Sequence, residues 1–245
     1  MTAVALIPAR MASSRFPGKP LALIHGRPMI EYVYRAVSQS PHLHATYVAT
    51  CDQEIADAVE AFGGNAILTG DHHERASDRC AEALETLSNS GSHIDIVVMV
   101  QGDEPMTHPR QISEVLEPFS ESSVSVVNLY SSLAADEASS RNVVKVVIDR
   151  HGDALYFSRL PIPGSMGAPA SPTGKQLGLI AFRSSALREF SALSATPYEI
   201  SESVDMLRFL EHGHKIRMRH TSHLTIAVDT PADLSAVEQV IPRPA

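Results

Sequence analysis

The sequence predicts an α/β protein in which a mixed, mostly parallel sheet is flanked by helices. Apolar runs suited to buried strands alternate with helical patterns through the first half of the chain. The first run, at residues 3–8, is almost wholly apolar, as expected for a parallel strand that is buried on both faces. Because crossovers between parallel strands are right-handed, these elements fit a Rossmann-like arrangement.

The elements of the first half follow one another in a regular order. Strands are expected at residues 3–8, 45–50, 65–68 and 95–100, with helices near 28–38, 53–61 and 76–88. Asp52 and Glu54 precede a run rich in alanine and valine, which is typical of a helix start. Gly63 and Gly64 are a natural stop for that helix.

The pattern changes after about residue 120. Short β-rich runs lie close together at residues 123–128, 143–148, 154–157 and 177–183. Such spacing indicates antiparallel or mixed pairing in an excursion from the main sheet, over about residues 123–183. Further helices are expected at 184–192, 201–211 and 231–239, and further strands near 215–219 and 224–228. We expect a single domain over residues 1–245.

One segment of this second half is predicted to be a loop by its composition. Residues 161–175 contain four prolines and three glycines. Both residue types interrupt regular structure, so we expect a mobile flap rather than a linker between domains.

Composition narrows the class of protein. The chain has 245 residues, of which 44% are hydrophobic, enough for a sizeable core. Its net charge of −8 makes nucleic acid an unexpected partner. No stretch approaches the ~18 apolar residues of a membrane span, and Arg10 and Arg15 interrupt the start where a signal peptide would stay apolar. We therefore expect a soluble cytoplasmic protein with Cys51 and Cys80 as reduced thiols.

A cationic loop directly follows the first strand. It contains Arg10, Arg15 and Lys19, together with two serines and a glycine, in a chain that has only four lysines. Ligands of open α/β sheets bind beyond the carboxyl ends of the strands, where backbone N–H groups and cationic side chains can hold phosphates. The loop therefore predicts a triphosphate site; the alternative is a surface loop that is merely basic.

Aspartates follow two further strand candidates. Asp103 comes after the apolar run 95–100, and Asp229 comes after the run 224–228. Mg²⁺ in proteins usually takes one or two carboxylates together with substrate phosphates. The pair therefore suits a transferase site with one or two metal ions. The alternative is that Asp103 caps the helix that follows it, and that Asp229 or Thr230 caps the last helix.

Two more segments carry residues suited to ligand binding. Arg75, Ser77 and Arg79 stand at a predicted helix start, where they can contact a base and a phosphate. The preceding pair, His72 and His73, suggests a metal site, but no third ligand has convincing spacing, and we interpret the pair as solvated residues at the helix start. The aromatic run at 155–159 ends in an arginine that suits an acidic acceptor, or is a core strand with an exposed arginine.

Taken in order, these segments resemble the CMP-Kdo synthetase family, the 3-deoxy-manno-octulosonate cytidylyltransferases. The resemblance covers about residues 3–240. Its motifs are Ile7-Pro8-Ala9-Arg10, Ser14-Arg15, Pro17-Gly18-Lys19-Pro20-Leu21, Tyr47-Val48-Ala49-Thr50, Gln101-Gly102-Asp103-Glu104-Pro105, Val144-Lys145-Val146-Val147, Ala154-Leu155-Tyr156-Phe157-Ser158-Arg159 and Val228-Asp229-Thr230-Pro231.

The resemblance implies the nucleotide-diphospho-sugar transferase variant of the Rossmann-like fold. It also implies transfer of CMP from CTP to an acidic acceptor, Kdo or a Kdo-like sugar acid, with release of pyrophosphate. The residues it implies for nucleotide binding are Pro8, Ala9, Arg10, Ser14, Arg15, Lys19, Arg75, Ser77, Arg79 and Gln101. The catalytic residues would be Arg10, Lys19, Asp103 and Asp229, of which the two aspartates would hold Mg²⁺. The acceptor would contact Gln101, Arg159, Gln176 and Glu202.

The chain departs from the family pattern mainly on the acceptor side. Residues 75–79 replace a Ser-Gly-Thr-(Asp/Glu)-Arg motif, Gln176 stands where the family has histidine, and Met206 stands where it has glutamine. Methionine cannot make the hydrogen bonds of glutamine. Three alternatives therefore stay open: a small phosphonate or other 2-keto acid as acceptor, a base other than cytosine, and a non-catalytic nucleotide-binding relative. The resemblance to this family also implies a homodimer.

Overall fold

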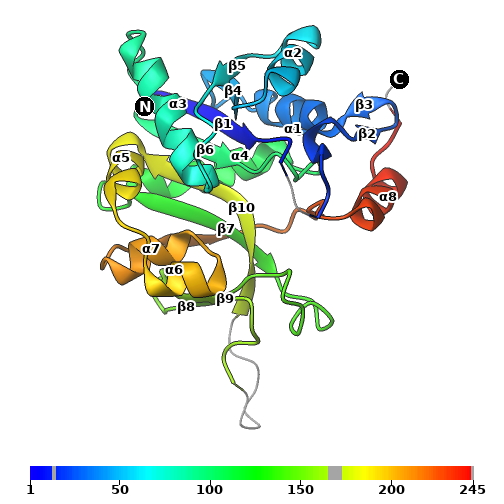
Figure 1. The fold of residues 1–245 in the computed structure, drawn as a ribbon. Helices are drawn as coiled ribbons and strands as arrows, with labels where there is room; N and C mark the ends of the chain where they lie inside the picture. Colours follow the sequence, from blue (N-terminus) through cyan, green and yellow to red (C-terminus); the bar gives the residue numbers. More distant parts are fainter. Residues whose placement is uncertain (13–14, 165–172, 244–245) are drawn as a thin grey trace. The chain divides into compact units, whose positions relative to one another are not determined.

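The computed structural model describes residues 1–12, 15–164 and 173–243, and the chain divides into two compact units. Unit 1 comprises Met1–Ser113 and Leu224–Ala245, so the C-terminal segment returns to it. Unit 2 comprises Glu114–His223. Figure 1 traces the chain through both. No helix in the described part is long and apolar enough to cross a membrane.

Unit 1 is built on four parallel strands in the order β6–β1–β4–β5. The strands are β1 (Ala3–Ala9), β4 (Ala45–Thr50), β5 (Ala66–Leu68) and β6 (Ile96–Val100). Every residue of β1 and β6 is buried, which is why both read as unbroken apolar runs. All four strand predictions of the first half are confirmed.

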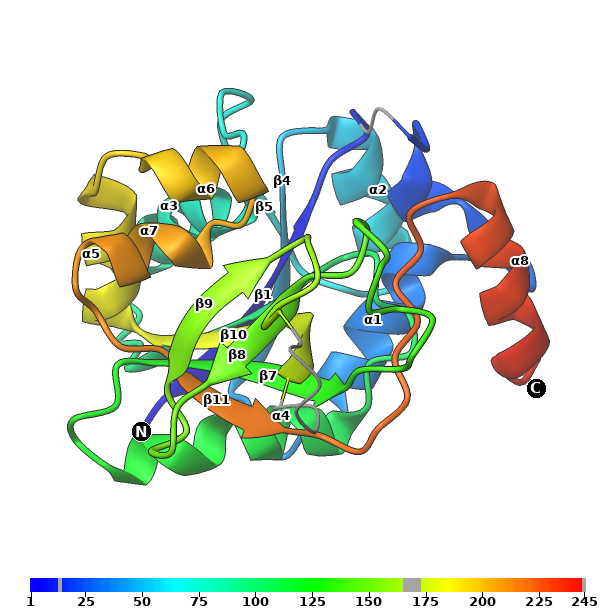
Figure 2. The same ribbon diagram turned by 90° about the horizontal axis from the view of Figure 1, so that it is seen from below.

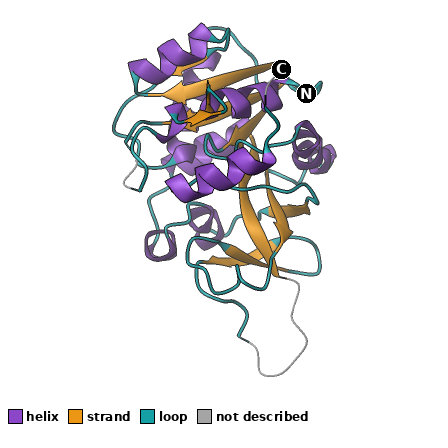
Figure 3. Cartoon of the chain, turned by 90° about the vertical axis from the view of Figure 1, so that its right-hand side faces the viewer, coloured by secondary structure: helices purple, strands orange, loops and turns teal. Residues whose placement is uncertain are grey.

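The described part of unit 1 also contains helices. They are α1 (Met29–Ser38), α2 (Gln53–Ala61), α3 (Ala76–Asn89) and α8 (Pro231–Val240); α4 (Pro109–Leu116) begins in this unit. Helices α1, α2 and α3 each contact strands of the parallel sheet, and Figure 3 shows helices on both sides of the strands in this unit. The short helix η1 (Lys19–Leu21) precedes a hairpin of β2 (Leu23–Ile24) and β3 (Arg27–Pro28), and α8 packs on β2 (Figure 1).

The strand predicted at residues 224–228 is wrong, because this segment is irregular in the structure. Its Val228 N–H donates to the carbonyl of Asp103 (2.9 Å), and its side chain packs with Ile24, Met29 and Val237. The apolar residues therefore reflect burial against a loop and a helix, without the ladder of hydrogen bonds that a strand needs.

Unit 2 is a mixed sheet in the order β11–β7–β10–β8–β9, which confirms the expected antiparallel or mixed pairing. Its strands are β7 (Val126–Ser132), β8 (Lys145–Ile148), β9 (Ala154–Ser158), β10 (Thr173–Arg183) and β11 (Arg217–His220). Only β11 and β7 run parallel. Figure 2 shows β8 and β9 side by side.

The predicted loop at 161–175 is wrong at its C-terminal end. Residues 173–175 open strand β10, because their backbone pairs with residues 145–147 of β8. Residues 165–172 of the predicted loop lie outside the described residues.

The helices of unit 2 are η2 (Glu117–Ser120), α5 (Ser184–Ala192), α6 (Pro197–Glu202) and α7 (Met206–Glu211). The single helix predicted at 201–211 is wrong, because Ser203 has a left-handed backbone (φ 52°) that ends α6. The carbonyls of Glu202 and Ser203 accept hydrogen bonds from the Arg159 side chain, at 2.7 and 3.2 Å. This tertiary contact replaces the helical hydrogen bonds that a continuous helix would have made.

Candidate active site

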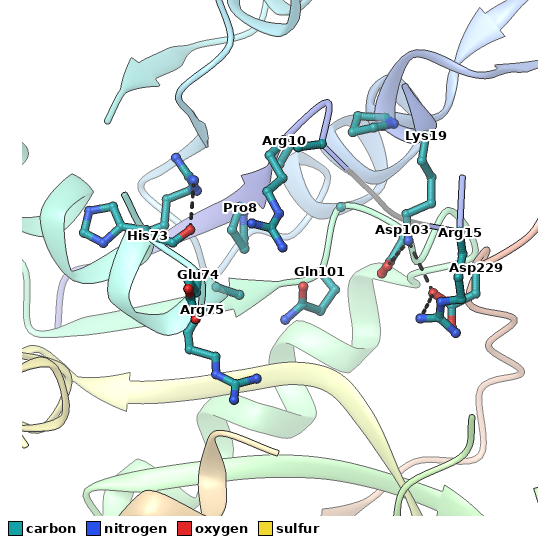
Figure 4. Close-up of a pocket in the computed structure, with 16 residues that line it drawn as sticks. Pro8, Arg10, Arg15, Lys19, His73, Glu74, Arg75, Gln101, Asp103 and Asp229 are labelled. Carbon is teal, nitrogen blue, oxygen red and sulfur yellow. Dashed lines mark hydrogen bonds and ion pairs between the residues drawn. The ribbon is translucent and has the colours of Figure 1, made fainter. Parts of the chain in front are cut away.

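A cavity of about 320 Å³ lies in unit 1, beyond the carboxyl ends of β1 and β6. Four segments supply its walls: the loop after β1, the segment before α3, the turn after β6, and Asp229, two residues before α8. Figure 4 shows these side chains. The lining residues are Pro8, Ala9, Arg10, Ala12, Arg15, Lys19, Pro20, His73, Glu74, Arg75, Ala76, Arg79, Gln101, Gly102, Asp103 and Asp229.

The cavity brings together most of the residues expected at the nucleotide. All of the predicted catalytic residues line it, as do Pro8, Ala9, Arg15, Arg75, Arg79 and Gln101. Ser77 does not line it, because its side chain is fully buried in α3. Ser14 lies outside the described residues.

Local backbone geometry explains how Lys19 reaches this cavity. Gly18 has a left-handed backbone (φ 70°) and its N–H donates to the Met11 carbonyl (3.0 Å), which turns the loop back on itself. The Met11 N–H in turn donates to the Asp52 carboxylate (2.7 Å) at the end of β4. The local pattern around Asp52 predicts only a helix start, and nothing in it signals this loop contact, 41 residues away.

The turn after β6 passes close to the end of β1 at Gly102. A Cβ atom on Gly102 would lie 3.1 Å from the Pro8 carbonyl oxygen and 3.3 Å from Ile30 Cδ1. Glycine therefore lets this turn pass closely over the end of β1. The result is that Gln101 and Asp103 are presented beside the cationic loop.

Lys19 connects the two aspartates. Its Nζ lies 2.6 Å from Asp103 Oδ2 and 3.4 Å from Asp229 Oδ1, and Arg15 Nη2 lies 2.9 Å from the same Asp229 oxygen. Figure 4 shows the cluster at one end of the cavity. The aspartates are 126 residues apart in the chain, yet the tertiary structure places both on one ammonium group.

Neither carboxylate is used as a helix cap in the structure. The N-cap of α8 is Thr230, whose Oγ1 accepts from the Asp233 N–H (3.3 Å). The Asp233 carboxylate accepts from the N–H groups of Asp229 and Thr230, at 3.1 and 2.8 Å. Asp103 lies six residues before α4 begins at Pro109. The capping alternative is therefore wrong for both aspartates but is confirmed for Thr230, and the carboxylates of the aspartates face cations instead.

Arg79 is largely occupied by the protein itself. Its guanidinium donates to Thr69 Oγ1 (2.5 Å) and to the carbonyls of Gly70 (3.1 Å) and His73 (3.5 Å). The side chain is 3% exposed. These contacts hold the segment before α3 in place, and Arg75 follows that segment on the cavity wall.

The residues expected at the acceptor, apart from Gln101, lie in unit 2. The Arg159 N–H donates to Glu202 Oε2 and Ser158 Oγ to Glu202 Oε1, both at 2.8 Å. Gln176 Nε2 donates to Asn128 Oδ1 (2.7 Å). Met206, the departure from the family glutamine, is fully buried in α7, where an apolar side chain fits. The acceptor roles of Arg159, Gln176 and Glu202 stay predictions.

One potential ligand was missed. The carboxylate of Glu82 lies with the imidazoles of His72 and His73, so a third metal-ligating residue is present after all. Glu82 stands nine residues after His73, on α3. The spacing between His73 and Glu82 matches no standard metal-ligand motif. The two residues meet only because the chain turns from the loop into α3 between them.

Comparisons with known proteins agree with this fold. A family model described as "Cytidylyltransferase" matches residues 4–216. The 3-deoxy-manno-octulosonate cytidylyltransferase of Geobacter metallireducens is 41% identical over 256 residues, covering 99% of each chain. That of Myxococcus xanthus is 42% identical over 240 residues, covering 97% of this chain and 96% of the relative.

Solved structures lead to the same class. A CMP:2-keto-3-deoxy-manno-octonic acid synthetase complexed with CTP has a TM-score of 0.90 and 39% identity, covering 98% of each chain. A cytidylyltransferase from Leptospira borgpetersenii, at 15% identity and a TM-score of 0.63, supports the fold alone. The fold and site thus define an enzyme of the nucleotidyltransferase class. Within that class, the chain belongs to the cytidylyltransferase family, and the predicted fold class and the resemblance to CMP-Kdo synthetases are confirmed.

Proposed function

We propose that this enzyme transfers CMP from CTP to Kdo or a Kdo-like sugar acid and releases pyrophosphate. The observation that carries the proposal is the contact of Lys19 with Asp103 and Asp229 in a cavity at the carboxyl ends of parallel strands. The names of its full-length relatives support Kdo as the acceptor.

The cations of the cavity suit a triphosphate. Arg10, Arg15 and Lys19 come from the loop after β1, and Arg75 comes from the opposite wall, before α3. Charge-assisted hydrogen bonds to phosphate oxygens are roughly twice as strong as neutral ones. When CTP enters, Lys19 and Arg15 exchange their carboxylate partners for phosphate oxygens, and the two carboxylates become available for another cation.

The donor set left by that exchange fits Mg²⁺. Asp103 and Asp229 offer hard carboxylate oxygens and already converge on one cationic group, the Lys19 ammonium. Bound there, Mg²⁺ would neutralise charge on the reacting phosphates. The protein's own cations then stabilise the charge that develops during transfer.

The reaction needs alignment more than covalent help from the protein. The acceptor hydroxyl oxygen forms a bond to the α-phosphorus of CTP, and the bond from that phosphorus to the bridging oxygen breaks. The electron pair and negative charge leave with pyrophosphate, and the hydroxyl proton is lost to solvent. Arg10 and Lys19 stabilise the charge on the phosphates, while the cavity holds the nucleotide in line.

One feature favours a second candidate acceptor. Arg75 stands where the family pattern has serine and lines the cavity, so it offers an additional cation. An added anionic group on the substrate would suit it, which makes CMP transfer to a small phosphonate or other 2-keto acid the alternative.

The proposal is tested by pyrophosphate release from CTP with Mg²⁺, with Kdo compared against a panel of phosphonates and 2-keto acids. Release with Kdo supports the proposed function. Release only with another acid shows that the substitutions on the acceptor side have changed the specificity. Replacing CTP with UTP tests the base, and light scattering in solution tests the expected homodimer.

A further inference from the structure

A cluster of two histidines and a glutamate lies outside the Lys19–Asp103–Asp229 contacts. His72 and His73 belong to the segment before α3, and Glu82 lies in the second turn of that helix. His73 Nε2 is hydrogen-bonded to Glu82 Oε2, and the two imidazole rings have centroids 4.1 Å apart. One ligand atom from each of the three residues lies within 4.8 Å of the others.

The carboxylate is held in place by the backbone. Both oxygens of Glu82 accept from the Gly70 N–H, at 3.1 and 3.0 Å. Arg79 also binds Thr69 and Gly70, so the whole segment is tied to α3.

Gly70 lies close to both the His72 ring and the Glu82 carboxylate. A Cβ atom on Gly70 would overlap the imidazole of His72 at Cε1 and Nδ1 and would lie 3.4 Å from Glu82 Oε2. A larger residue at this position would require the exposed His72 ring to turn away. The first imidazole is therefore seated against the same backbone that orients the carboxylate.

We propose that His72, His73 and Glu82 form a binding site for a borderline divalent cation such as Zn²⁺. Two imidazoles and one carboxylate are ligands that Zn²⁺ takes in proteins, with a fourth position left to water. His72 is exposed, so that position is accessible. Bonds of about 2.0–2.2 Å need ligand atoms about 3–3.5 Å apart. Binding would therefore replace the direct His73–Glu82 hydrogen bond with bonds from both residues to the ion, and would require the exposed His72 ring to turn toward it.

The aspartate pair in the cavity and the histidine cluster offer different ligand atoms and therefore suit different cations. Asp103 and Asp229 present only oxygen, which suits Mg²⁺, whereas the histidine cluster presents nitrogen as well. His73 also lines the nucleotide cavity, and Glu74 and Arg75 follow it on the wall. A cation bound to His73 would thus fix the position of this wall.

The test is calorimetric titration of Zn²⁺ into the full chain without an affinity tag, in the presence of excess Mg²⁺. We expect one Zn²⁺ per chain for the wild type. His72→Ala should weaken binding by more than about 100-fold, because even the loss of an outer partner of a metal ligand costs 10–100-fold. Since His72 is exposed and does not line the cavity, this variant is expected to fold normally.

Two further variants make the result specific. His42→Ala removes another exposed histidine of unit 1 and should leave Zn²⁺ binding unchanged. Glu82→Gln keeps an oxygen that can accept from Gly70 but removes the negative charge, so it should weaken binding. Equal Zn²⁺ binding by the wild type and His72→Ala would overturn the proposal, as would loss of the ion in Asp103→Asn instead. None of these measurements requires turnover, so they stand apart from the test of the proposed function.

Discussion

In unit 1, the charged side chains of the cavity stay partly open to solvent: Lys19 is 13%, Asp103 26% and Asp229 27% exposed. In unit 2, the Arg208 and Glu199 side chains are only 6% and 0% exposed. The first group bonds mainly to other side chains that can change partners. The second group is enclosed, so any lost partner leaves a buried charge. Exposure therefore distinguishes charges available to a ligand from charges that hold the fold together.

Two lysines show the same difference in exposure: Lys145 is enclosed by the protein, whereas Lys19 stays partly open to solvent. Lys145 is fully buried in unit 2 and donates to the carbonyls of Ser140, Val143 and Arg159, at 2.6, 2.9 and 2.7 Å. These three acceptors use all three ammonium hydrogens. Burial lowers its pKa. Lys19 instead contacts two carboxylates at the edge of a cavity, an arrangement that phosphates can replace.

The largest expected effect is on the buried pair of unit 2. The Arg208 Nε and Nη2 donate to the two oxygens of Glu199, at 2.8 and 2.7 Å, and the guanidinium lies over the Phe190 ring. Arg208→Ala should lower the free energy of unfolding by about 3–5 kcal/mol, because the Glu199 charge stays buried. Urea unfolding measures this, and a Glu199→Gln/Arg208→Met double variant should recover part of the loss. If Arg208→Ala kept its stability but lost turnover, the contrast between the units would fail.

Next in size is the loss of either cavity carboxylate. Asp103→Asn and Asp229→Asn should each lower Mg²⁺-dependent kcat by about 10²–10³-fold, with little change in stability. Asp233→Asn is the matched control, since Asp233 is the partner of the N-cap Thr230 in the capping box of α8. It should lower the free energy of unfolding by about 1 kcal/mol and leave kcat near that of the wild type. Full activity in either cavity variant would show that the metal assignment is incorrect.

A smaller loss is expected from Lys19→Ala. The variant should lower kcat/KM for CTP by about 10–100-fold, because one cation that faces the triphosphate is removed. Initial rates across CTP concentrations measure the effect. Lys215→Ala, which removes a side chain that is 79% exposed in unit 2, is the control. Unchanged CTP kinetics in Lys19→Ala would refute its role at the phosphates.

The smallest effect tests an ion pair of intermediate exposure in unit 2. Burial raises the pKa of Glu137, but Lys175, 2.6 Å away, and the Ala134 N–H lower it by more. Because the folded pKa is lowered, this stabilisation is complete above the unfolded pKa and is lost as the pH falls through the folded pKa. Glu137→Gln should therefore cost up to about 1 kcal/mol at neutral pH and progressively less below about pH 4. A cost independent of pH, measured by urea unfolding at several pH values, would contradict this.

Local patterns in the sequence are enough to predict much of the fold. The buried runs of β1 and β6, the bounds of α2 and α5, and the change to mixed pairing after about residue 120 follow from short-range periodicity. The cationic loop and the two aspartates were also identifiable, because each follows an apolar run and has a distinctive composition. Such features depend on residues within a few positions of one another.

Other features depended on contacts between distant residues. The break between α6 and α7 follows from Arg159, more than 40 residues earlier, and the irregular segment 224–228 follows from its contact with Asp103. The Glu82 carboxylate meets His73 only after the chain enters α3. The sequence by itself determined the parallel core, the cytidylyltransferase motifs and the residue types of the site. Tertiary structure alone decided which charges meet, because a distance of 2.6 Å between Lys19 and Asp103 arises from the packing of segments 84 residues apart.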